Sequence, residues 1–346
     1  MTSTAAPVKP LPADMAATIT WAVDQRERVQ SVARRAVEAG MKNVWFVGSG
    51  GSLFASSPVG YLLAQRATSF GAFRMSANEF NHIRPVQVGP DSLVVVGSHS
   101  GKTPETLEAI ETARSLGVRT IVGIGRPDDS PLAQGVDEMF AYGSKETVWE
   151  PKQILLAHLA HGLLTAAGDE TEQEREAAAA SYAALPAVIP AALTSQDEAL
   201  AGMAARLADQ PIIYVLGSGP NEDVARCLSM CYLQEMQWLH SAAYNAGEFF
   251  HGAFEMVTEN TPVILFLGRD ATRPVAERAS RFLDKYTKAA YRIDSASLDM
   301  PGVSEHMFPE IDPIVLGSTV TRIAQHFEAV TGHSLEIRRY MFKVEY

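Results

Sequence analysis

Short apolar runs alternate with amphipathic segments along most of the chain, and most of the runs end at glycine. The runs cover residues 44–50, 93–98, 120–125, 212–219, 262–268 and 290–294. Between them lie segments with helical periodicity, of which 104–117 and 274–287 are the clearest. Apolar runs of this length are typical of buried strands, and strands that alternate with helices form parallel sheets covered by helices on both faces. The pattern therefore predicts an α/β fold.

The two halves of the chain repeat the same glycine positions. The turn Gly48-Ser49-Gly50 recurs as Gly217-Ser218-Gly219, and Gly97 recurs as Gly268. The nearly constant offset indicates an internal duplication, so we expect two α/β/α domains in tandem. The expected boundaries are an N-terminal tail and helix over 1–30, a first domain over 31–165, a connecting segment over 166–195 and a second domain over 196–346.

Composition narrows the class of protein. The 346 residues suffice for two cores, and 47% hydrophobic with 20% charged residues is a globular profile. A net charge of −11 disfavours nucleic acid as a partner. No uninterrupted apolar run reaches the roughly 18 residues that span a bilayer, and the N-terminus lacks the pattern of a signal peptide, so we expect a cytoplasmic protein without a membrane contact. Cys227 and Cys231 fall four apart on a predicted helix and are interpreted as small buried residues, not as a disulfide or zinc site.

The segment 98–103, Ser-His-Ser-Gly-Lys-Thr, stands where a strand gives way to a helix. Thr103 followed by Pro104 is a good helix start, and the free N–H groups of a helix N-terminus favour an anion. Ser98, Ser100 and Thr103 add hydroxyl donors, and Gly101 allows close approach to the backbone. The segment predicts a phosphate cradle, although a well-capped turn rich in hydroxyls is an equally good interpretation of the spacing alone.

The duplicate favours the phosphate interpretation. At the equivalent position the second half has Arg269-Asp270-Ala271-Thr272-Arg273, so the serines are not required by the fold. We therefore expect one phosphate site per chain. Ser52, in the glycine-rich turn 48–56, could reach the same ligand, whereas a plain strand–helix turn explains that glycine-rich pattern as well.

Glu235 is the first candidate for acid–base chemistry. It falls on a predicted helical stripe with Val224, Leu228, Cys231 and Trp238. A carboxylate on an apolar stripe has a raised pKa if it is unpaired, which suits proton transfer. A buried salt bridge or an exposed glutamate explains the same pattern.

Two further candidates follow. His251 lies between Gly247 and Gly252 and could act as an acid or base, whereas His158 and His161 lie in an apolar helix and are interpreted as structural. Lys343 belongs to a C-terminal segment that is unusually apolar, so we expect that segment to dock against the protein, although terminal lysines are usually solvated.

Residues 48–52 (GSGGS) together with 98–103 (SHSGKT) resemble the SIS (sugar isomerase) domain family, and the resemblance extends over two tandem domains from about residue 30. It implies flavodoxin-like parallel sheets, and it implies that Ser98, Ser100 and Thr103 bind a sugar phosphate with Ser52 nearby. The same architecture forms the isomerase half of glucosamine-6-phosphate synthase. That synthase has an acidic residue where this chain has Lys102.

The resemblance also implies roles for the catalytic candidates. Glu235 would move a proton between C1 and C2 of the sugar, His251 would help to open the ring, and Lys343 would match the family's C-terminal lysine as a second acid–base or a Schiff-base former. Homodimers are typical of the family, with the histidine supplied across the interface.

The segments 247–255 and 338–346 resemble the fructosamine-6-phosphate deglycases. This resemblance implies cleavage of a 6-phosphofructosyl amino acid to glucose 6-phosphate and a free amino acid, without a metal or another cofactor. The alternatives are a phosphosugar isomerase, an aminosugar-phosphate deaminase and a non-catalytic regulator that binds a sugar phosphate. The chain carries no glutaminase segment, and no helix-turn-helix arm of the kind found in SIS regulators.

Overall fold

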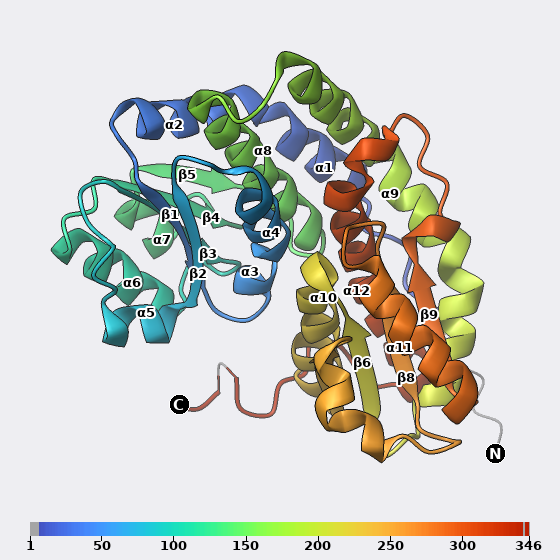
Figure 1. Cartoon of the computed structure of the whole chain (residues 1–346). Coiled ribbons are helices and arrows are strands. Elements are labelled where there is room, and N and C mark those ends of the chain that lie inside the picture. The colour runs from blue at the N-terminus through green and yellow to red at the C-terminus, as the bar shows by residue number, and fades with distance from the viewer. Residues whose placement is uncertain (1–6, 342, 346) are drawn as a thin grey trace. The chain divides into compact units, whose positions relative to one another are not determined.

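The computed structural model describes residues 7–341 and 343–345 and divides the chain into two compact units (Figure 1). The N-terminal unit consists of residues 12–187 and 301–310. The C-terminal unit consists of residues 188–300 and 311–346, together with the segment before residue 12. Each unit is built around its own parallel sheet, as the alternating sequence pattern predicts.

The sheet of the N-terminal unit has the strand order β2-β1-β3-β4-β5, with all neighbours parallel. This is the flavodoxin-like order, so the expected fold class is confirmed. The strands are β1 (Asn43–Gly48), β2 (Gly71–Ser76), β3 (Ser92–Ser98), β4 (Thr120–Gly125) and β5 (Glu138–Ala141).

Helices cover both faces of this sheet (Figure 1). Trp45 and Val47 of β1 and Val94 of β3 point into a core shared with the α5 and α6 side, whereas Phe46 and Val95 line the opposite face. Alternate residues of each central strand are therefore buried on opposite faces of the sheet, and this explains why these strands appear in the sequence as continuous apolar runs. The helices are α1 (Met15–Asp24), α2 (Arg26–Glu38), α3 (Gly51–Phe54), α4 (Ser57–Arg66), α5 (Ala77–Ile83), α6 (Pro104–Ser115), α7 (Pro131–Gly135) and α8 (Trp149–Ala167).

The sheet of the C-terminal unit has four strands in the described residues, in the order β7-β6-β8-β9. They are β6 (Ile213–Gly217), β7 (Ser241–Asn245), β8 (Val263–Leu267) and β9 (Ala290–Asp294). This unit also has the helices α10 (Glu222–Arg226) and α11 (Arg273–Tyr286) and the short helices η1 (Gly219–Asn221), η3 (Glu248–His251), η4 (Ala253–Met256) and η5 (Ser295–Ser297). The short η6 (Glu305–Met307) belongs to the N-terminal unit.

Several elements differ from the sequence expectation. The strands β2, β5 and β7 are absent from the predicted set because they are edge strands whose residues are mostly half-buried, so they lack a continuous apolar run. The first 30 residues were expected to hold one helix, but α1 and the start of α2 both lie there.

Two long helices have residues in both units. These are α9 (Glu172–Leu207), which includes much of the expected connecting segment, and α12 (Phe308–Thr331). By length and composition, α9 is the one helix in the described part of the chain that could cross a membrane. Because core helices of soluble proteins pass the same test, and 44% of its apolar window is buried, this is weak support for a membrane span.

The helix that carries Cys227 and Cys231 is not a regular α-helix. Residues Cys227–Gln234 form the π-helical segment η2, in which the Glu235 N–H donates to the Met230 carbonyl five residues back. The wider turn breaks the expected stripe, since Cys231 is half-buried and Trp238 is 39% exposed with a φ of +57°. π-Helical turns are rare and often occur at functional sites.

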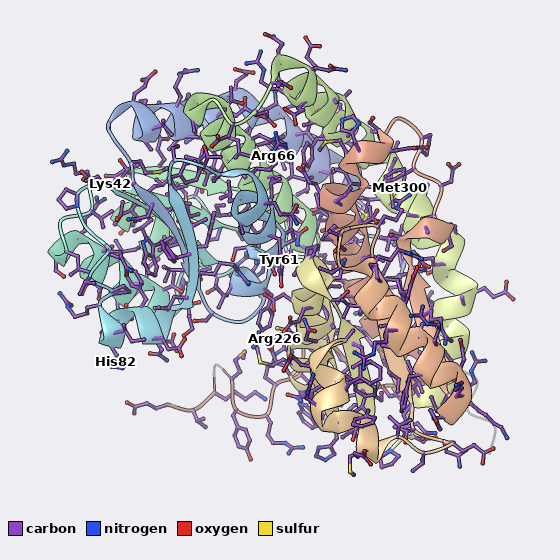
Figure 2. The ribbon with its side chains drawn as sticks, viewed as in Figure 1. Lys42, Tyr61, Arg66, His82, Arg226 and Met300 are labelled. Atoms are coloured by element: carbon purple, nitrogen blue, oxygen red, sulfur yellow. The ribbon has the colours of Figure 1, made fainter. Side chains whose placement is uncertain are left out.

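His161 lies in a buried ion-pair cluster within the N-terminal unit. Its Nδ1 is 2.6 Å from Oε1 of Glu170, and its Nε2 is 2.9 Å from Oε2 of Glu310. Arg66, labelled in Figure 2, places its Nη1 3.7 Å from the same Glu170 oxygen. Burial lowers the pKa of His161, but its hydrogen bonds with the two carboxylates outweigh burial and raise the pKa to about 9. The structural interpretation of His161 therefore has a definite physical basis.

This cluster predicts a loss of stability at alkaline pH. Because the pKa of His161 is higher in the folded than in the unfolded protein, its contribution is complete below about pH 6.5 and disappears as the pH rises through about 9. We expect the free energy of unfolding to fall by about 2–3 kcal/mol over this window. Urea unfolding from pH 6 to 10 measures the loss, and His161→Gln should flatten this part of the curve. Parallel curves for the two proteins would contradict the assignment.

Candidate functional site

The phosphate-site candidates of the N-terminal unit gather at the carboxyl edge of its sheet. Ser52 follows β1, the loop 98–103 follows β3, and these two strands are neighbours with Gly48 opposite Gly97. The strand order reverses between β1 and β3, and ligands of open α/β sheets bind in the crevice at this reversal. A Cβ added to Gly97 would lie 3.2 Å from the Cβ of Ser52, so the turn and the strand end pack closely.

The loop 98–103 is ordered by its own hydrogen bonds. The hydroxyls of Ser98 and Thr103 lie 2.8 Å apart, and the Gly101 N–H donates to Oγ of Ser98 over 3.1 Å. Ser98 is 2% exposed, so its hydroxyl shapes the loop from within. Ser100, which is half-buried, is therefore the better residue to replace in a test of phosphate binding.

The N-terminus of α6 has no side-chain cap from the loop residue Thr103. Thr103 stands at the N-cap position with an extended backbone, as expected, but its side chain makes no capping hydrogen bond. Its hydroxyl is paired with Ser98 instead, because the loop folds back on itself. The N–H groups of Thr106 and Leu107 donate to the Thr103 carbonyl, so the Thr103 side chain takes no part in capping a helix end whose dipole favours an anion.

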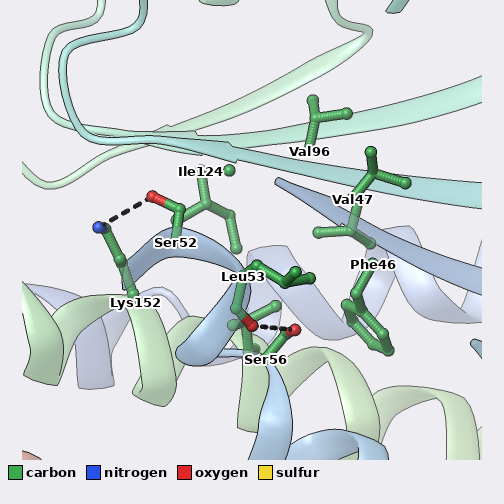
Figure 3. A pocket seen from close by; sticks show the side chains of 11 residues that line it. Phe46, Val47, Ser52, Leu53, Ser56, Val96, Ile124 and Lys152 are labelled. Atoms are coloured by element: carbon green, nitrogen blue, oxygen red, sulfur yellow. Dashed lines mark hydrogen bonds between the residues drawn. The ribbon is translucent and has the colours of Figure 1, made fainter. Parts of the chain in front are cut away.

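A pocket lies beside the turn that follows β1 (Figure 3). Its wall includes Ser52, Ser56 and Gly97, the strands β1, β3 and β4, and Lys152 from α8. Lys152 is 5% exposed, and its Nζ lies 3.2 Å from Oγ of Ser52. Lys152 was not among the residues predicted from the sequence, although a lysine directly before the apolar run of α8 was a visible indication.

His99, the second residue of the loop, also lies in this region. Its Nδ1 is 2.7 Å from the hydroxyl of Tyr142, and the two rings are stacked. Burial, followed by the charges of Lys152 and Arg126, lowers the pKa of His99 to about 3. His99 is therefore neutral at physiological pH, and the loop lies in a positive electrostatic field.

The duplicate loop in the C-terminal unit is occupied by the chain's own carboxylates. Asp270 accepts hydrogen bonds from the Thr272 N–H at 2.8 Å and from Nδ2 of Asn221 at 3.2 Å. The Arg269 side chain donates to Asp312 at 2.6 Å, and the Arg273 side chain pairs with Asp294 at 2.7 Å.

In this loop the donors that could bind an anion already contact a carboxylate, and the surrounding acidic side chains would repel a phosphate. This arrangement supports a single phosphate site per chain, in the N-terminal unit.

Glu235 follows the π-helical segment of the C-terminal unit and contacts the C-terminal tail, defined here as residues 332–346. Its Oε1 accepts a hydrogen bond from Nε of Arg338 at 2.8 Å, with the two side chains 24% and 15% exposed. The sequence left open whether Glu235 is unpaired or held in a salt bridge, and the structure shows the salt bridge. Burial raises the pKa of Glu235 above its usual value, and Arg338 only partly opposes that rise.

The described part of the tail docks through His333, whose ring centre lies 4.4 Å from that of Trp238, through the Leu335 N–H, which donates to Glu328, and through its arginines. Beside the Arg338 pair, the guanidinium of Arg339 lies 4.3 Å from the Trp238 ring centre. Tyr340 and Val344 are 63% and 53% exposed, which differs from the expectation that the apolar side chains of the tail dock. Phe342 and Tyr346, which belong to the same expectation, lie outside the described residues.

His251 and Lys343 are both exposed within the C-terminal unit. His251 ends η3, and the N–H of Lys343 donates to the Tyr340 carbonyl. In the described part of the C-terminal unit neither side chain forms a hydrogen bond or an ion pair with Glu235, and their roles stay predictions. Among residues 7–341 and 343–345, no group of three or more His, Cys, Asp or Glu side chains is placed to hold a metal ion.

Comparison with known proteins identifies the family. The SIS domain model matches residues 39–158 and 206–293, which is one match in each half of the chain. Fructosamine deglycase FrlB of Bacillus subtilis (strain 168) is 38% identical over 306 residues, covering 88% of this chain and 92% of that protein. Fructoselysine 6-phosphate deglycase of Escherichia coli (strain K12) is 24% identical, covering 90% and 89% of the two chains.

Solved structures agree with the sequence relatives. A crystal structure described as a phosphosugar isomerase from Bacillus subtilis superposes with a TM-score of 0.86 at 34% identity, covering 94% of this chain and all of that one. The C-terminal domain of glucosamine-fructose-6-phosphate aminotransferase from Francisella tularensis shares the fold, with a TM-score of 0.76 at 18% identity and coverage of 91% and 96%. The chain belongs to the SIS domain family, as a tandem SIS enzyme of the group that contains deglycases and phosphosugar isomerases.

Proposed function

We propose that the protein is a deglycase that cleaves a 6-phosphofructosyl amino acid into glucose 6-phosphate and a free amino acid. The observation that carries the proposal is the ordered loop 98–103, which leads into the N-terminus of α6 at the carboxyl edge of the first sheet. Such a loop binds a phosphate group and so fixes the position of the sugar. The relatives that are named as deglycases support this choice of substrate.

The reaction needs a proton carrier more than any other group. In the proposed sequence Glu235 removes a proton from C1 of the open-chain ketosamine, which forms an enaminol. Return of the proton at C2 leaves an imine between C1 and the nitrogen, and water then cleaves this imine to the aldehyde and the amine. Burial raises the pKa of Glu235, and a carboxylate with a raised pKa is a stronger base for the first transfer and can return the proton in the second. His251 and Lys343 are proposed to assist ring opening and the transfers.

Product analysis tests this proposal. The enzyme should release equal amounts of glucose 6-phosphate and amino acid from a panel of 6-phosphofructosyl amino acids, and much less from the unphosphorylated fructosyl compounds. Glucosamine 6-phosphate and fructose 6-phosphate serve as comparison substrates. Release of ammonia from glucosamine 6-phosphate would identify a deaminase. Isomerisation of fructose 6-phosphate without amine release would identify an isomerase. Either result in place of deglycation would refute the proposal.

A homodimer in the cytoplasm with a shared active site is part of the same proposal. Mixed chains that carry Glu235→Gln and His251→Ala should regain activity if a dimer site combines groups from both chains. No recovery after verified subunit exchange would mean that one chain supplies both groups.

A further inference from the structure

Lys152 is a buried cation at the carboxyl edge of the N-terminal sheet. It lies in the first turns of α8, its side chain is almost completely covered, and its Nζ is 3.2 Å from Oγ of Ser52. The ring centre of Tyr142 lies 5.9 Å from the same nitrogen. Ser52 and Tyr142 in turn border the loop 98–103, through Gly97 and through His99. One side chain thus joins both of the segments expected to bind phosphate.

The pocket wall determines which kind of ligand suits this lysine. Of the eleven residues that line the pocket, all within the described chain, Lys152 alone carries a charge (Figure 3). The rest of the wall is apolar apart from the two hydroxyls of Ser52 and Ser56. A positive charge beside two serine hydroxyls favours an anion that accepts hydrogen bonds.

The charge of Lys152 reaches the phosphate loop itself. It is one of the two charges, with that of Arg126, that help burial to keep His99 neutral. Apart from the exposed Lys102, the loop offers hydroxyl and N–H dipoles, which carry no net charge, and the chain as a whole has a net charge of −11. A phosphate dianion approaching this protein therefore needs a local cation, and a cation in buried surroundings attracts an anion more strongly than a solvated one does.

We propose that Lys152 binds the phosphate group of the substrate and is a specificity-determining residue that distinguishes phosphorylated from unphosphorylated sugars. This inference deepens the proposed function and rests on it for the identity of the substrate. It assigns the phosphate affinity to a buried lysine of α8 as well as to the hydroxyls of the loop.

The test compares Lys152→Met with a matched surface variant, Lys145→Met. Lys145 lies seven residues earlier and is exposed, so its replacement removes the same charge from the chain without touching the pocket. Calorimetry with glucose 6-phosphate should show about 10- to 100-fold weaker binding for Lys152→Met and wild-type affinity for Lys145→Met, because a charged hydrogen bond is lost only in the first. Binding of glucose should be equally weak in all three proteins. Lys152→Arg should restore part of the affinity.

Kinetics separate substrate binding from a structural role. Lys152→Met should raise KM by about the same factor as the binding constant while kcat changes little, since its charge acts on a group that does not react. If Lys152→Met is not folded by circular dichroism, Lys152→Gln, which retains a donor for Ser52, replaces it in both measurements.

Several outcomes would overturn the inference. These are glucose 6-phosphate affinity within twofold of wild type in the Lys152 variant, equal losses in the Lys152 and Lys145 variants, or a loss only in Lys102→Met, which removes the exposed lysine of the loop. A wild-type protein that binds glucose 6-phosphate no better than glucose would also overturn it. A wild-type protein that binds glucose 6-phosphate but releases no amino acid would refute the proposed deglycase function alone, and Lys152 would still be tested by binding.

Discussion

Replacement of Glu235 by glutamine should lower kcat by about 10²- to 10⁴-fold, which is the usual contribution of a general acid–base group. The change keeps the shape of the side chain and removes its ability to carry a proton. KM should change little, because substrate affinity is set largely by the phosphate group. Steady-state release of glucose 6-phosphate measures both constants.

The ion pair between Arg338 and Glu235 allows a second test, based on the pH dependence of kcat. Because Arg338 partly opposes the rise in the pKa of Glu235, Arg338→Gln should raise that pKa further. The acidic limb of the kcat profile should then move to higher pH, while kcat at alkaline pH stays close to that of the wild type. A purely structural ion pair would leave the profile unchanged in shape.

Stability gives a second readout for the same pair. Because both side chains are partly exposed, loss of either should lower the free energy of unfolding by no more than about 1 kcal/mol. A nearly normal kcat in Glu235→Gln combined with this lower stability would show that the ion pair is only structural. Glu248 and Glu255, both exposed near His251, would then be the next carboxylates to replace.

Replacement of Gly101 by alanine should both weaken substrate binding and destabilise the N-terminal unit. Gly101 has a φ of +66°, and an added Cβ would lie 2.3 Å from Oγ and 2.4 Å from Cβ of Ser130. Ser130 is the N-cap of α7, so its displacement also disturbs that helix. We expect a loss of about 2–4 kcal/mol in the free energy of unfolding and an increase in KM of at least about tenfold.

Gly143→Ala is the matched control for this variant. Gly143 has a similar φ of +75°, but an added Cβ would meet nothing within 4 Å. It should therefore lose only about 1 kcal/mol, which is the cost of the backbone conformation, and should keep its KM. Urea unfolding and substrate kinetics on both variants separate the cost of the positive φ, which both share, from the steric clash with Ser130, which only Gly101→Ala has. Equal losses in the two variants would mean that Ser130 moves aside without consequence.

The sequence predicted the central strands better than the edge strands. β1 and β3 are buried on both faces, so their apolar runs reveal them, whereas β2 and β7 are partly exposed at the sheet edges and carry mixed residues. Likewise, the glycine repeat indicated the duplication because close backbone approaches recur wherever the same fold recurs. The family comparison and the two parallel sheets confirm the tandem arrangement.

The sequence by itself determined the fold class, the duplication and the segment 98–103, because strand burial and a hydroxyl-rich strand–helix turn are local properties of the chain. Only the tertiary structure decided the partners of each charged group, since these come from distant segments. It pairs Glu235 with Arg338, 103 residues further along the chain, and brings Lys152 to Ser52 across 100 residues. It also shows that the Ser98 hydroxyl faces into its own loop. These contacts depend on how the helices pack against the sheets, and that packing is determined by residues throughout the core.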